Sequence, residues 1–373
     1  MSQYRPKVLH LVVAANIGGA EHFVSNLAAR SDLTNADHAI ALMTANGKLK
    51  ELFKDAHLNL HDRGFTEEPP LAHFKRLFGA ADLRWLARVL SDEKATVIHA
   101  HTYGSHILSA RAAKLTNIPL MRTEHGVGHY HDRTRALYRH WSLINTNRIA
   151  AVSQYVANVV KALEPRVRSK TEVIWSGVDT TRFAYAPQRT DEMLTLAWTA
   201  RLDPIKKAEI AIAAVSRVPG VRLNLAGAGA ERTNLQYLVT RLGLADRVSF
   251  LGYQSDIRGV IAGSHAVINC TREEGLPIAL IEAASMGRAA IAFNGGGIPE
   301  VVEDRQTGWL AKEYSVDAFA ALIVEAKNNR QNLSKFGANA RVRAETRFSL
   351  EGMCRRYGAA YSELVQTHAA NRA

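Results

Sequence analysis

The sequence predicts an α/β fold with two Rossmann-like, doubly wound domains. Short runs of β-branched and other apolar residues recur along the 373-residue chain, and each precedes a segment of helical periodicity. Near-continuous apolar strands that alternate with helices are typical of parallel sheets covered on both faces. A 47% share of hydrophobic residues over this length is enough for a core in each of two domains.

The expected strands fall into two series, one in each half of the chain. The first series covers residues 7–14, 38–43, 96–101 and 149–153. The second series covers residues 194–200, 222–226, 248–252, 266–269 and 289–293. The polar stretch 179–192 between them contains Pro187 and has no apolar periodicity. We therefore expect an N-terminal domain over residues 1–185 and a C-terminal domain over residues 186–350.

The last residues, 351–373, predict a helix with one apolar stripe. From residue 348 onward the apolar side chains recur at helical intervals, at Met353, Tyr357, Tyr361, Leu364 and Val365. Such a stripe is either buried in the protein's own core or forms an oligomer contact.

The net charge of the chain indicates which classes of partner it can bind. The chain has 47 Lys and Arg against 35 Asp and Glu, a net charge of +12, and residues 1–185 carry 24 against 16, a net +8. This excess favours anionic partners such as phosphates, nucleic acid or acidic lipid. A nucleic-acid-binding protein is disfavoured, because the aromatic residues are 7% of the chain and are not interleaved with basic ones as a stacking platform requires.

Neither a membrane span nor a secretion signal is expected. No stretch approaches the roughly 20 apolar residues that cross a bilayer. Residues 5–15 resemble a signal peptide, but His10 interrupts the apolar run and no cleavage pattern follows, so a buried first strand is the better interpretation. The two cysteines, Cys270 and Cys354, lack metal-ligand spacing and fit a reducing cytoplasm.

Two helix starts in the second half form a candidate anion site. The strand at 266–269 leads into a helix start at residues 275–278, and the strand at 289–293 leads into a second start at 295–300. The free amides and the positive dipole end of a helix bind anions. Two such starts at the ends of neighbouring parallel strands predict a diphosphate site, although either alone could be an ordinary strand-helix turn.

Two cations follow another strand of the same half. Arg201 and Lys206 come just after the strand at 194–200, where they can face the same anion. A basic loop of this kind is, by itself, usually a solvated surface. The chain has no Asp-x-Asp pair to hold a divalent metal, so these cations and the helix amides would have to stabilise a departing diphosphate.

These motifs resemble the signature of glycosyltransferase family 4. Glu274 and Glu282 have the spacing of that signature, with seven residues between them, and a Gly-Gly-Gly-Ile-Pro-Glu run follows at 295–300. Further short motifs extend the resemblance over most of the chain, at residues 16–21, 98–101, 123–126, 201–206 and 226–229. The resemblance implies the GT-B fold, in which the last helix crosses back to the N-terminal domain, and a retaining reaction of a nucleotide sugar in the cleft between the domains.

The resemblance also implies roles in the C-terminal domain. Glu282 would bind the ribose hydroxyls, and Glu274 would lie by the donor sugar and support developing positive charge. Backbone and side chains of the surrounding loops would hold the diphosphate, namely Arg201, Lys206, Gly275, Leu276, Pro277 and Ile278. The nucleoside would lie by Gly227, Gly229 and Tyr253.

In the N-terminal domain, the loop with Gly18 and Gly19 would close over the phosphates. His125 would lie near the donor sugar, where its carbonyl and ring could stabilise positive charge, although a structural role for His125 stays open. His99 and His101 are interpreted as cleft lining or satisfied polar groups, because the sequence shows no third metal ligand at recognisable spacing. We expect no metal and no cofactor.

Two departures from the family pattern stand out. Lys207 stands where the family commonly has glycine after the phosphate lysine, which makes the backbone geometry there less certain. Cys270-Thr271 replaces a frequent Pro-Ser, and Thr271 keeps the hydroxyl. Cys270 fits a small buried residue better than a nucleophile, because no base is evident beside it.

The expected function is that of a cytoplasmic, retaining glycosyltransferase. It would use a UDP- or GDP-linked sugar and a glycan or lipid-linked acceptor, in the synthesis of bacterial cell-surface polysaccharide or glycolipid. Other activities on the same fold are a nucleotide-sugar epimerase and a phosphorylase. The side chains declare neither the base nor the acceptor.

A basic amphipathic helix at residues 73–90 suggests where an acceptor in a membrane would meet the protein. Its apolar side chains can share one side, with cations at the borders, and these are Phe74, Leu77, Phe78, Leu83, Leu86 and Leu90 with Lys75, Arg76 and Arg88. Such helices bind anionic interfaces, each cation adding about 1 kcal/mol. The alternative is an ordinary surface helix whose stripe packs on the first sheet.

Overall fold

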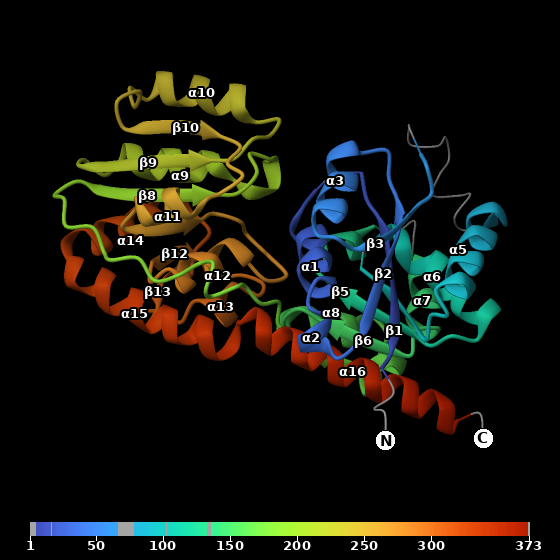
Figure 1. Ribbon diagram of the computed structural model, residues 1–373. Coiled ribbons are helices and arrows are strands. Elements are labelled where there is room, and N and C mark those ends of the chain that lie inside the picture. Colours follow the sequence, from blue (N-terminus) through green and yellow to red (C-terminus); the bar gives the residue numbers. More distant parts are fainter. Residues whose placement is uncertain (1–4, 16, 66–77, 102, 133–135, 372–373) are drawn as a thin grey trace. The chain divides into compact units, whose positions relative to one another are not determined.

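The computed structural model describes residues 5–15, 17–65, 78–101, 103–132 and 136–371. Contacts divide the chain into two compact units (Figure 1). Unit 1 comprises Met1–Ser176 and Leu350–Ala373, and unit 2 comprises Gly177–Ser349. The first boundary therefore falls before the predicted residue 185, so residues 177–185 belong to unit 2.

Unit 1 is built on a seven-stranded parallel sheet. Its strands are β1 (Lys7–Val13), β2 (Asp37–Met43), β3 (Asn59–Asp62), β4 (Val97–Ala100), β5 (Leu120–Glu124), β6 (Arg148–Ala151) and β7 (Thr171–Val173). Their order in space is β3-β2-β1-β4-β5-β6-β7. From β1 the strands are added first toward one edge of the sheet, as β2 and β3, and then toward the other edge, beginning with β4. Open α/β sheets bind ligands at the carboxyl ends of the strands at such a switch point.

Helices cover both faces of this sheet, as Figure 1 shows. They are α1 (Gly19–Ala28), α2 (Ser31–Thr34), α3 (Gly47–Asp55), α5 (Ala81–Asp92), α6 (Tyr103–Thr116), α7 (Ala136–Ile144), α8 (Gln154–Leu163) and α16 (Leu350–Ala370), with two 3-10 turns, η1 (Gly128–His131) and η3 (Pro165–Lys170). One core lies under α1, α3 and α16. A second core, on other side chains of the same strands, lies under α5 and α6.

The last helix returns to unit 1, as the resemblance implied. Met353, Tyr357, Tyr361 and Leu364 are buried in the core that α1 also covers, and Val365 packs against that core. The predicted apolar stripe of α16 is therefore part of the interior of unit 1.

Unit 2 repeats the architecture with a six-stranded parallel sheet. Its strands are β8 (Leu194–Thr199), β9 (Val221–Ala226), β10 (Val248–Gly252), β11 (Ala266–Asn269), β12 (Ala289–Phe293) and β13 (Gly308–Ala311), in the spatial order β10-β9-β8-β11-β12-β13. Its helices are α9 (Ala208–Ser216), α10 (Arg232–Arg241), α11 (Arg258–Ala262), α12 (Ile278–Ser285), α13 (Ile298–Val301), α14 (Val316–Asn328) and α15 (Arg330–Arg347), with the 3-10 turn η4 (Pro204–Lys206). Here the order reverses between β8 and β11.

All nine expected strands are present, with ends that differ by at most two residues. The structure adds four that the sequence analysis did not expect, β3, β5, β7 and β13. β3 is only partly buried and β7 has three residues, so neither carries a long apolar run. β5 contains Arg122, Thr123 and Glu124, which are buried but polar.

The proposed membrane-binding helix is only partly within the described residues. Residues 73–77, which include Phe74, Lys75, Arg76 and Leu77, lie outside them. In the described part, Leu86 and Leu90 of α5 are buried in the core on that face, and Leu83 packs against it. This packing matches the alternative of an ordinary surface helix. None of the helices in the described part of the chain combines the length and apolarity of a membrane span.

Candidate functional site

The predicted donor residues gather where the strand order of unit 2 reverses. β8 and β11 are hydrogen-bonded neighbours, with registers that pair Leu196 with Ala266 and Ala197 with Val267. The loop after β8 carries Arg201 and Lys206, and the loop after β11 carries Glu274 and leads into α12. The fold therefore brings the basic loop and the glutamate loop to the same crevice, as parallel sheets of this order require.

Lys206 and Glu274 meet directly. Nζ of Lys206 lies 2.8 Å from Oε1 of Glu274, and Nδ2 of Asn269 donates to the same oxygen at 2.9 Å. Both charged side chains are mostly buried, with 20% and 13% of their surfaces exposed. Burial alone would raise the pKa of Glu274, but the charge of Lys206 and the bond from Asn269 outweigh it and lower the pKa. Glu274 is thus held ionised.

The glycine run at 295–297 supports the backbone of Glu274. A Cβ at Gly295 would lie 2.0 Å from the carbonyl oxygen of Arg272, and one at Gly296 would lie 2.4 Å from that of Glu274. Gly296 also has a positive φ of 59°, and the amide of Gly297 donates to the carbonyl of Glu274 at 2.7 Å. These glycines let one loop pack closely against another.

The helix start after Glu274 is close to the predicted one. Pro277 caps α12, whose first residue is Ile278, and Leu276 is buried. Pro277 was predicted to be the first helical residue, and the structure places it one position earlier, as the cap. The amides of Gly275 and Ile278 remain the candidates for anion binding at this helix end.

Glu282 projects from α12 into a poorly hydrated environment. Burial raises the pKa of its carboxyl group to about 7, and the positive charge of Arg182 offsets only part of this effect. A desolvated carboxylate is a strong acceptor for hydroxyl groups. Arg182 belongs to an Arg-Phe pair that is one of the motifs of the resemblance, but no role was predicted for it from the sequence.

The remaining donor residues are more exposed. Arg201 pairs with Asp203 at 3.0 Å and keeps 56% of its side-chain surface exposed, so its guanidinium can still reach an anion. Tyr253 is 74% exposed on the loop after β10. A Cβ at Gly227 or Gly229 would lie 2.0 Å or 2.3 Å from the carbonyl oxygens of Ala200 and Leu202. Those two glycines therefore hold the loop after β9 against the loop after β8.

Lys207 has the backbone that glycine would favour. Its φ is 60° and its ψ 42°, in the left-handed region, at the position that caps α9. A residue with a side chain is strained there by about 1–2 kcal/mol. The loop thus keeps the conformation expected for the family's glycine although the residue is lysine.

In unit 1, the Gly18-Gly19 loop begins α1. The amide of Gly18 donates to Oε2 of Glu21 at 2.8 Å, so this amide is already occupied by a carboxylate. Around Gly19 there is no atom within 4 Å of a Cβ position among the described residues, which leaves room for a ligand. The predicted phosphate contact of Gly18 would require the Glu21 bond to be exchanged.

His125 follows β5 and borders a cavity of about 340 Å³ within unit 1. Burial lowers the pKa of His125 to about 3, so its ring is neutral. The ring stands edge-on to Phe23, with centroids 4.8 Å apart. Other lining residues are His101, His106, Glu124 and His129.

The structure supplies the third ligand-type residues that the sequence analysis did not find. His10 joins His99 and His101, and Glu124 joins His106 and His129, each group with its candidate atoms within 4.8 Å of one another. The first group forms because β1 lies beside β4, with His10 in register with His99. Histidines so far apart in the chain carry no sequence signal of their meeting. In that group His10 and His101 are hydrogen-bonded to each other at 2.8 Å.

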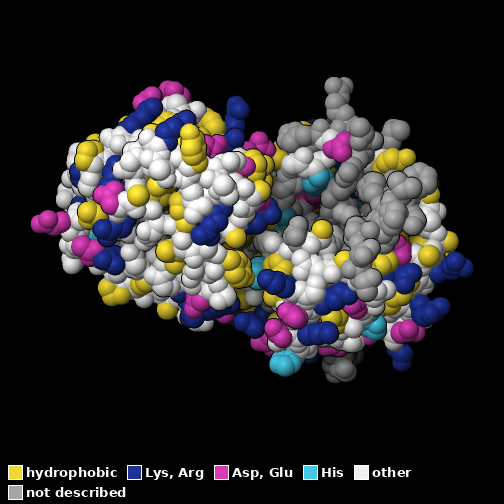
Figure 2. All heavy atoms as spheres, turned by 90° about the horizontal axis from the view of Figure 1, so that it is seen from above, with side chains coloured by type: hydrophobic (Ala, Val, Ile, Leu, Met, Phe, Trp, Pro, Cys, Tyr) yellow, Lys and Arg dark blue, Asp and Glu magenta, His cyan; other side chains and the backbone are white. Residues whose placement is uncertain are grey.

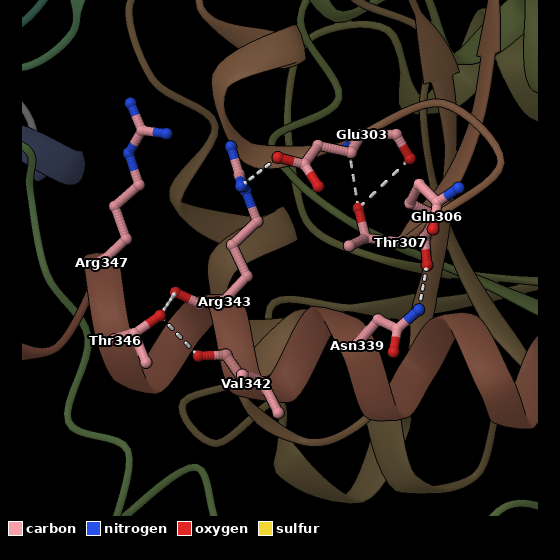
Figure 3. A pocket seen from close by; sticks show the side chains of 8 residues that line it. All are labelled: Glu303, Gln306, Thr307, Asn339, Val342, Arg343, Thr346 and Arg347. Atoms are coloured by element: carbon pink, nitrogen blue, oxygen red, sulfur yellow. Dashed lines mark hydrogen bonds and ion pairs between the residues drawn. The ribbon is translucent and has the colours of Figure 1, made fainter.

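A larger cavity of about 470 Å³ lies beside α15 in unit 2 (Figure 3). Figure 3 shows Asn339 bonded to the backbone of Gln306 and Arg343 paired with Glu303. This cavity beside α15 shares no lining residue with the predicted donor site. On the face of unit 2 at the left of Figure 2, basic and acidic side chains are interspersed, with no single basic stripe.

The two cysteines lie outside these groups. Cys270 and Cys354 are both buried free thiols, and burial raises the pKa of each. Cys270 is thus a small buried residue, as expected from the sequence.

Two family models match the chain in succession. One described as Glycosyltransferase Family 4 matches residues 17–182, and one described as Glycosyl transferases group 1 matches residues 183–343. The two matches meet near the boundary between the units, so the first falls mainly on unit 1 and the second on unit 2.

Comparison with individual proteins also finds glycosyltransferases. One subunit of the human phosphatidylinositol N-acetylglucosaminyltransferase is 30% identical over 227 residues, which are 57% of this chain and 46% of that protein. The chain thus spans about half the length of this relative. The D-inositol 3-phosphate glycosyltransferase of Mycolicibacterium smegmatis is 24% identical over 300 residues, 73% of this chain and 69% of that one. The crystal structure of Anabaena Alr3699/HepE in complex with UDP has a TM-score of 0.83 at 22% identity, covering 96% of this chain and 100% of that one. This likeness confirms the GT-B fold.

Proposed function

Because this chain belongs to the family 4 glycosyltransferases, we propose that it is a retaining enzyme that moves a sugar from a nucleotide-diphosphate sugar to a hydroxyl group of a glycan or lipid-linked acceptor. The observation that carries the proposal is the meeting of Lys206 and Glu274 at the crevice between β8 and β11. The strand order of the sheet reverses at this point, where such sheets bind ligands. The cation there can contact the diphosphate of the donor, and the ionised carboxylate can contact its sugar.

The donor would lie along this crevice in unit 2. Glu282 accepts hydrogen bonds from the ribose hydroxyls, and Lys206 and Arg201 hold the diphosphate with the amides at the start of α12. Glu274 stabilises positive charge that develops on the sugar as the diphosphate leaves. UDP is the first nucleotide to test, because the structural neighbour from Anabaena binds it, and GDP is the second.

We propose that the leaving diphosphate is neutralised without a metal. The side chain of Lys206, in the loop after β8, keeps 20% of its surface exposed. The guanidinium group of Arg201 stays accessible although it pairs with Asp203. Two positive charges and the helix dipole then match the charge that builds up on the leaving oxygen.

The acceptor would be bound by unit 1, whose sequence up to residue 185 carries the larger share of the positive charge. In this proposal His125 lies beside the donor sugar. Gly18 and Gly19 lie beside the phosphates. A role in bacterial cell-surface polysaccharide or glycolipid synthesis, in the cytoplasm or at the inner face of the membrane, is part of the proposal.

A thermal-shift screen against UDP, GDP, ADP and their sugars tests the donor class, because a ligand that binds only folded protein raises its melting temperature. Transfer or donor hydrolysis is then measured in EDTA, and the anomer of the product is read by NMR. Activity that EDTA abolishes and magnesium or manganese restores would contradict the metal-free scheme, and an inverted product would contradict retention.

The same assay separates the other activities of this fold. An epimerase would interconvert the donor with no acceptor present. A phosphorylase that uses pyridoxal phosphate would show the absorbance of an internal aldimine in the purified protein.

A further inference from the structure

A chain of buried hydrogen bonds in unit 1 connects α2 to the cavity beside His125. Oγ1 of Thr34 lies 2.7 Å from Nε2 of His38, and Nδ1 of His38 lies 2.8 Å from Nε2 of His10. Nδ1 of His10 lies 2.8 Å from Nε2 of His101, which lines the cavity of about 340 Å³. All four side chains are buried, with between 0% and 7% of their surfaces exposed.

The direction of each bond in this chain is assigned from its far end, at Thr34. The hydroxyl of Thr34 donates its one proton to the carbonyl oxygen of Arg30 at 3.0 Å, since a carbonyl can only accept. Thr34 therefore accepts from His38, which must carry its proton on Nε2. Burial lowers the pKa of His38 to about 3, so the ring is neutral and its Nδ1 accepts.

The same reasoning passes along the next two rings. Burial lowers the pKa of both His10 and His101 well below the ordinary value, so each ring holds one proton. His10 donates from Nε2 to His38 and accepts at Nδ1. His101 must then donate from Nε2 to His10, which leaves its Nδ1 without a proton.

Nδ1 of His101 is the open end of the chain. It is buried and has no hydrogen-bond partner among the residues that the structure describes. Oε2 of Glu124, in the lining of the same cavity, also accepts no well-formed hydrogen bond within the described residues, and Nε2 of His129 lies 3.4 Å from it. No Lys or Arg is found among the described lining residues. The cavity thus offers bare lone pairs, which attract hydroxyl donors and repel an anion.

We propose that His101 is a hydrogen-bond acceptor of fixed tautomer that binds a hydroxyl group of a neutral polyol portion of the acceptor, with Thr34, His38 and His10 as the positioning residues that fix its tautomer. The proposal rests on the proposed function for the nature of the ligand, since a glycosyl acceptor presents hydroxyls. The tautomer does not rest on the proposed function: it follows from the hydrogen bonds of the chain and the neutral state of its buried rings.

The tautomer is measured by NMR on the full chain labelled with ¹⁵N in histidine only. Two-bond correlations from ring protons distinguish a protonated from a bare ring nitrogen, and His101→Gln identifies the His101 signals. We expect wild-type His101 to be bare at Nδ1. A proton on Nδ1 overturns the proposal whether or not any variant folds.

A threonine variant tests the cause of that tautomer. Thr34→Val removes the acceptor for His38, so a proton left on Nε2 of His38 would be a buried donor without a partner. We expect the chain to reverse, with the proton of His101 moving to Nδ1 and a change in tautomer ratio of about tenfold or more. Thr116→Val is the matched control, because Oγ1 of Thr116 also bonds to a carbonyl four residues earlier, at 2.8 Å, but contacts no histidine of the chain. An unchanged tautomer in a folded Thr34→Val protein contradicts the positioning role.

Ligand class is tested with methyl α-D-glucopyranoside and inorganic phosphate as probes. The glucoside should shift the Nδ1 signal of wild-type His101, and phosphate should not. A response to phosphate alone, or to neither probe, overturns the hydroxyl assignment. Calorimetry with UDP is run on the same samples, so that a failure of nucleotide binding counts against the proposed function and leaves the tautomer result to stand by itself.

Discussion

Lys206 and Glu274 form an ion pair in the protein without ligand, with Nζ 2.8 Å from Oε1. The cation proposed for the diphosphate is therefore held by the carboxylate proposed for the sugar. Their loops follow different strands, β8 and β11, so the pair also ties the two sides of the donor crevice together. A bound donor must share Lys206 with Glu274 or replace this bond.

Glu274→Gln should separate binding from chemistry. The change removes the charge that holds Lys206, so affinity for the nucleoside diphosphate should stay the same or rise. Turnover of the sugar nucleotide should fall by about two decades, because a charge that stabilises the transition state is lost. Calorimetry and initial rates measure the two effects. Glu273→Gln, on an exposed neighbour, is the matched control and should leave both unchanged.

Glu282 should make nucleotide binding depend on pH. Its pKa is about 7 in the free protein, and ribose hydroxyls bind the ionised form. Affinity should therefore weaken as the pH falls below about 7. Glu282→Ala should cost about 1.5–3 kcal/mol of binding, or roughly one to two decades, and Glu282→Gln should remove the pH dependence. Equal affinity from pH 5.5 to 8 in the wild type would argue against this carboxylate as the ribose ligand.

The same raised pKa has a consequence for stability. In the folded protein the pKa of Glu282 is about 7, above its ordinary value of 4.5. The carboxyl group therefore stabilises the fold at a pH below 4.5, and this contribution is lost as the pH rises through about 7. Chemical unfolding at several pH values should show this slope in the wild type and a smaller one in Glu282→Gln.

Lys207→Gly should stabilise unit 2. The φ of 60° strains a residue that has a Cβ, and glycine relieves the strain at some cost in chain entropy. Lys207→Ala is the control, because it removes the side chain and keeps the Cβ. The glycine variant should exceed the alanine variant by about 1 kcal/mol in free energy of unfolding. A less stable glycine variant would mean that the backbone changes once the lysine is removed.

Membrane contact is testable by flotation with liposomes. The burial of Leu86 and Leu90 leaves the positive charge of the N-terminal residues as its main support. Association with anionic liposomes should then be reversible and should fall steeply with salt. Binding unchanged by Lys75→Glu with Arg76→Glu, or no flotation at low salt, would favour an acceptor met in solution.

The sequence predicted β8, β11 and β12, which are apolar runs, and the structure brings Lys206 and Glu274 together after β8 and β11. β13 is also buried along its length, but it was missed. β5 was missed because Arg122 and Glu124 look like solvent-exposed residues, whereas in the structure they pair with each other inside unit 1. Local pattern cannot show that this pair is buried, since burial depends on which elements cover the strand.

Some residues of the candidate site could be identified from the sequence, and some of their contacts could not. Lys206, Glu274 and Glu282 could be selected by motif and spacing, and Lys207 could be flagged because glycine was expected there. The contact of His10 with His101 could not, because it depends on the strand order in the sheet. The contacts of Asn269 with Glu274 and of Glu21 with the Gly18 amide, which had been assigned to phosphate, are local, but they depend on how each loop folds.

The central claim is that a nucleoside diphosphate binds in unit 2 with its phosphates at Lys206 and its ribose at Glu282. Calorimetry should compare the diphosphate that gives the largest thermal shift with its nucleoside, in wild type, Lys206→Ala and Glu282→Ala. We predict that Lys206→Ala weakens the diphosphate by about one to two decades and leaves the nucleoside unchanged, whereas Glu282→Ala weakens both. Wild-type affinity of the diphosphate in both variants, or equal weakening of the nucleoside by Lys206→Ala, would contradict the account.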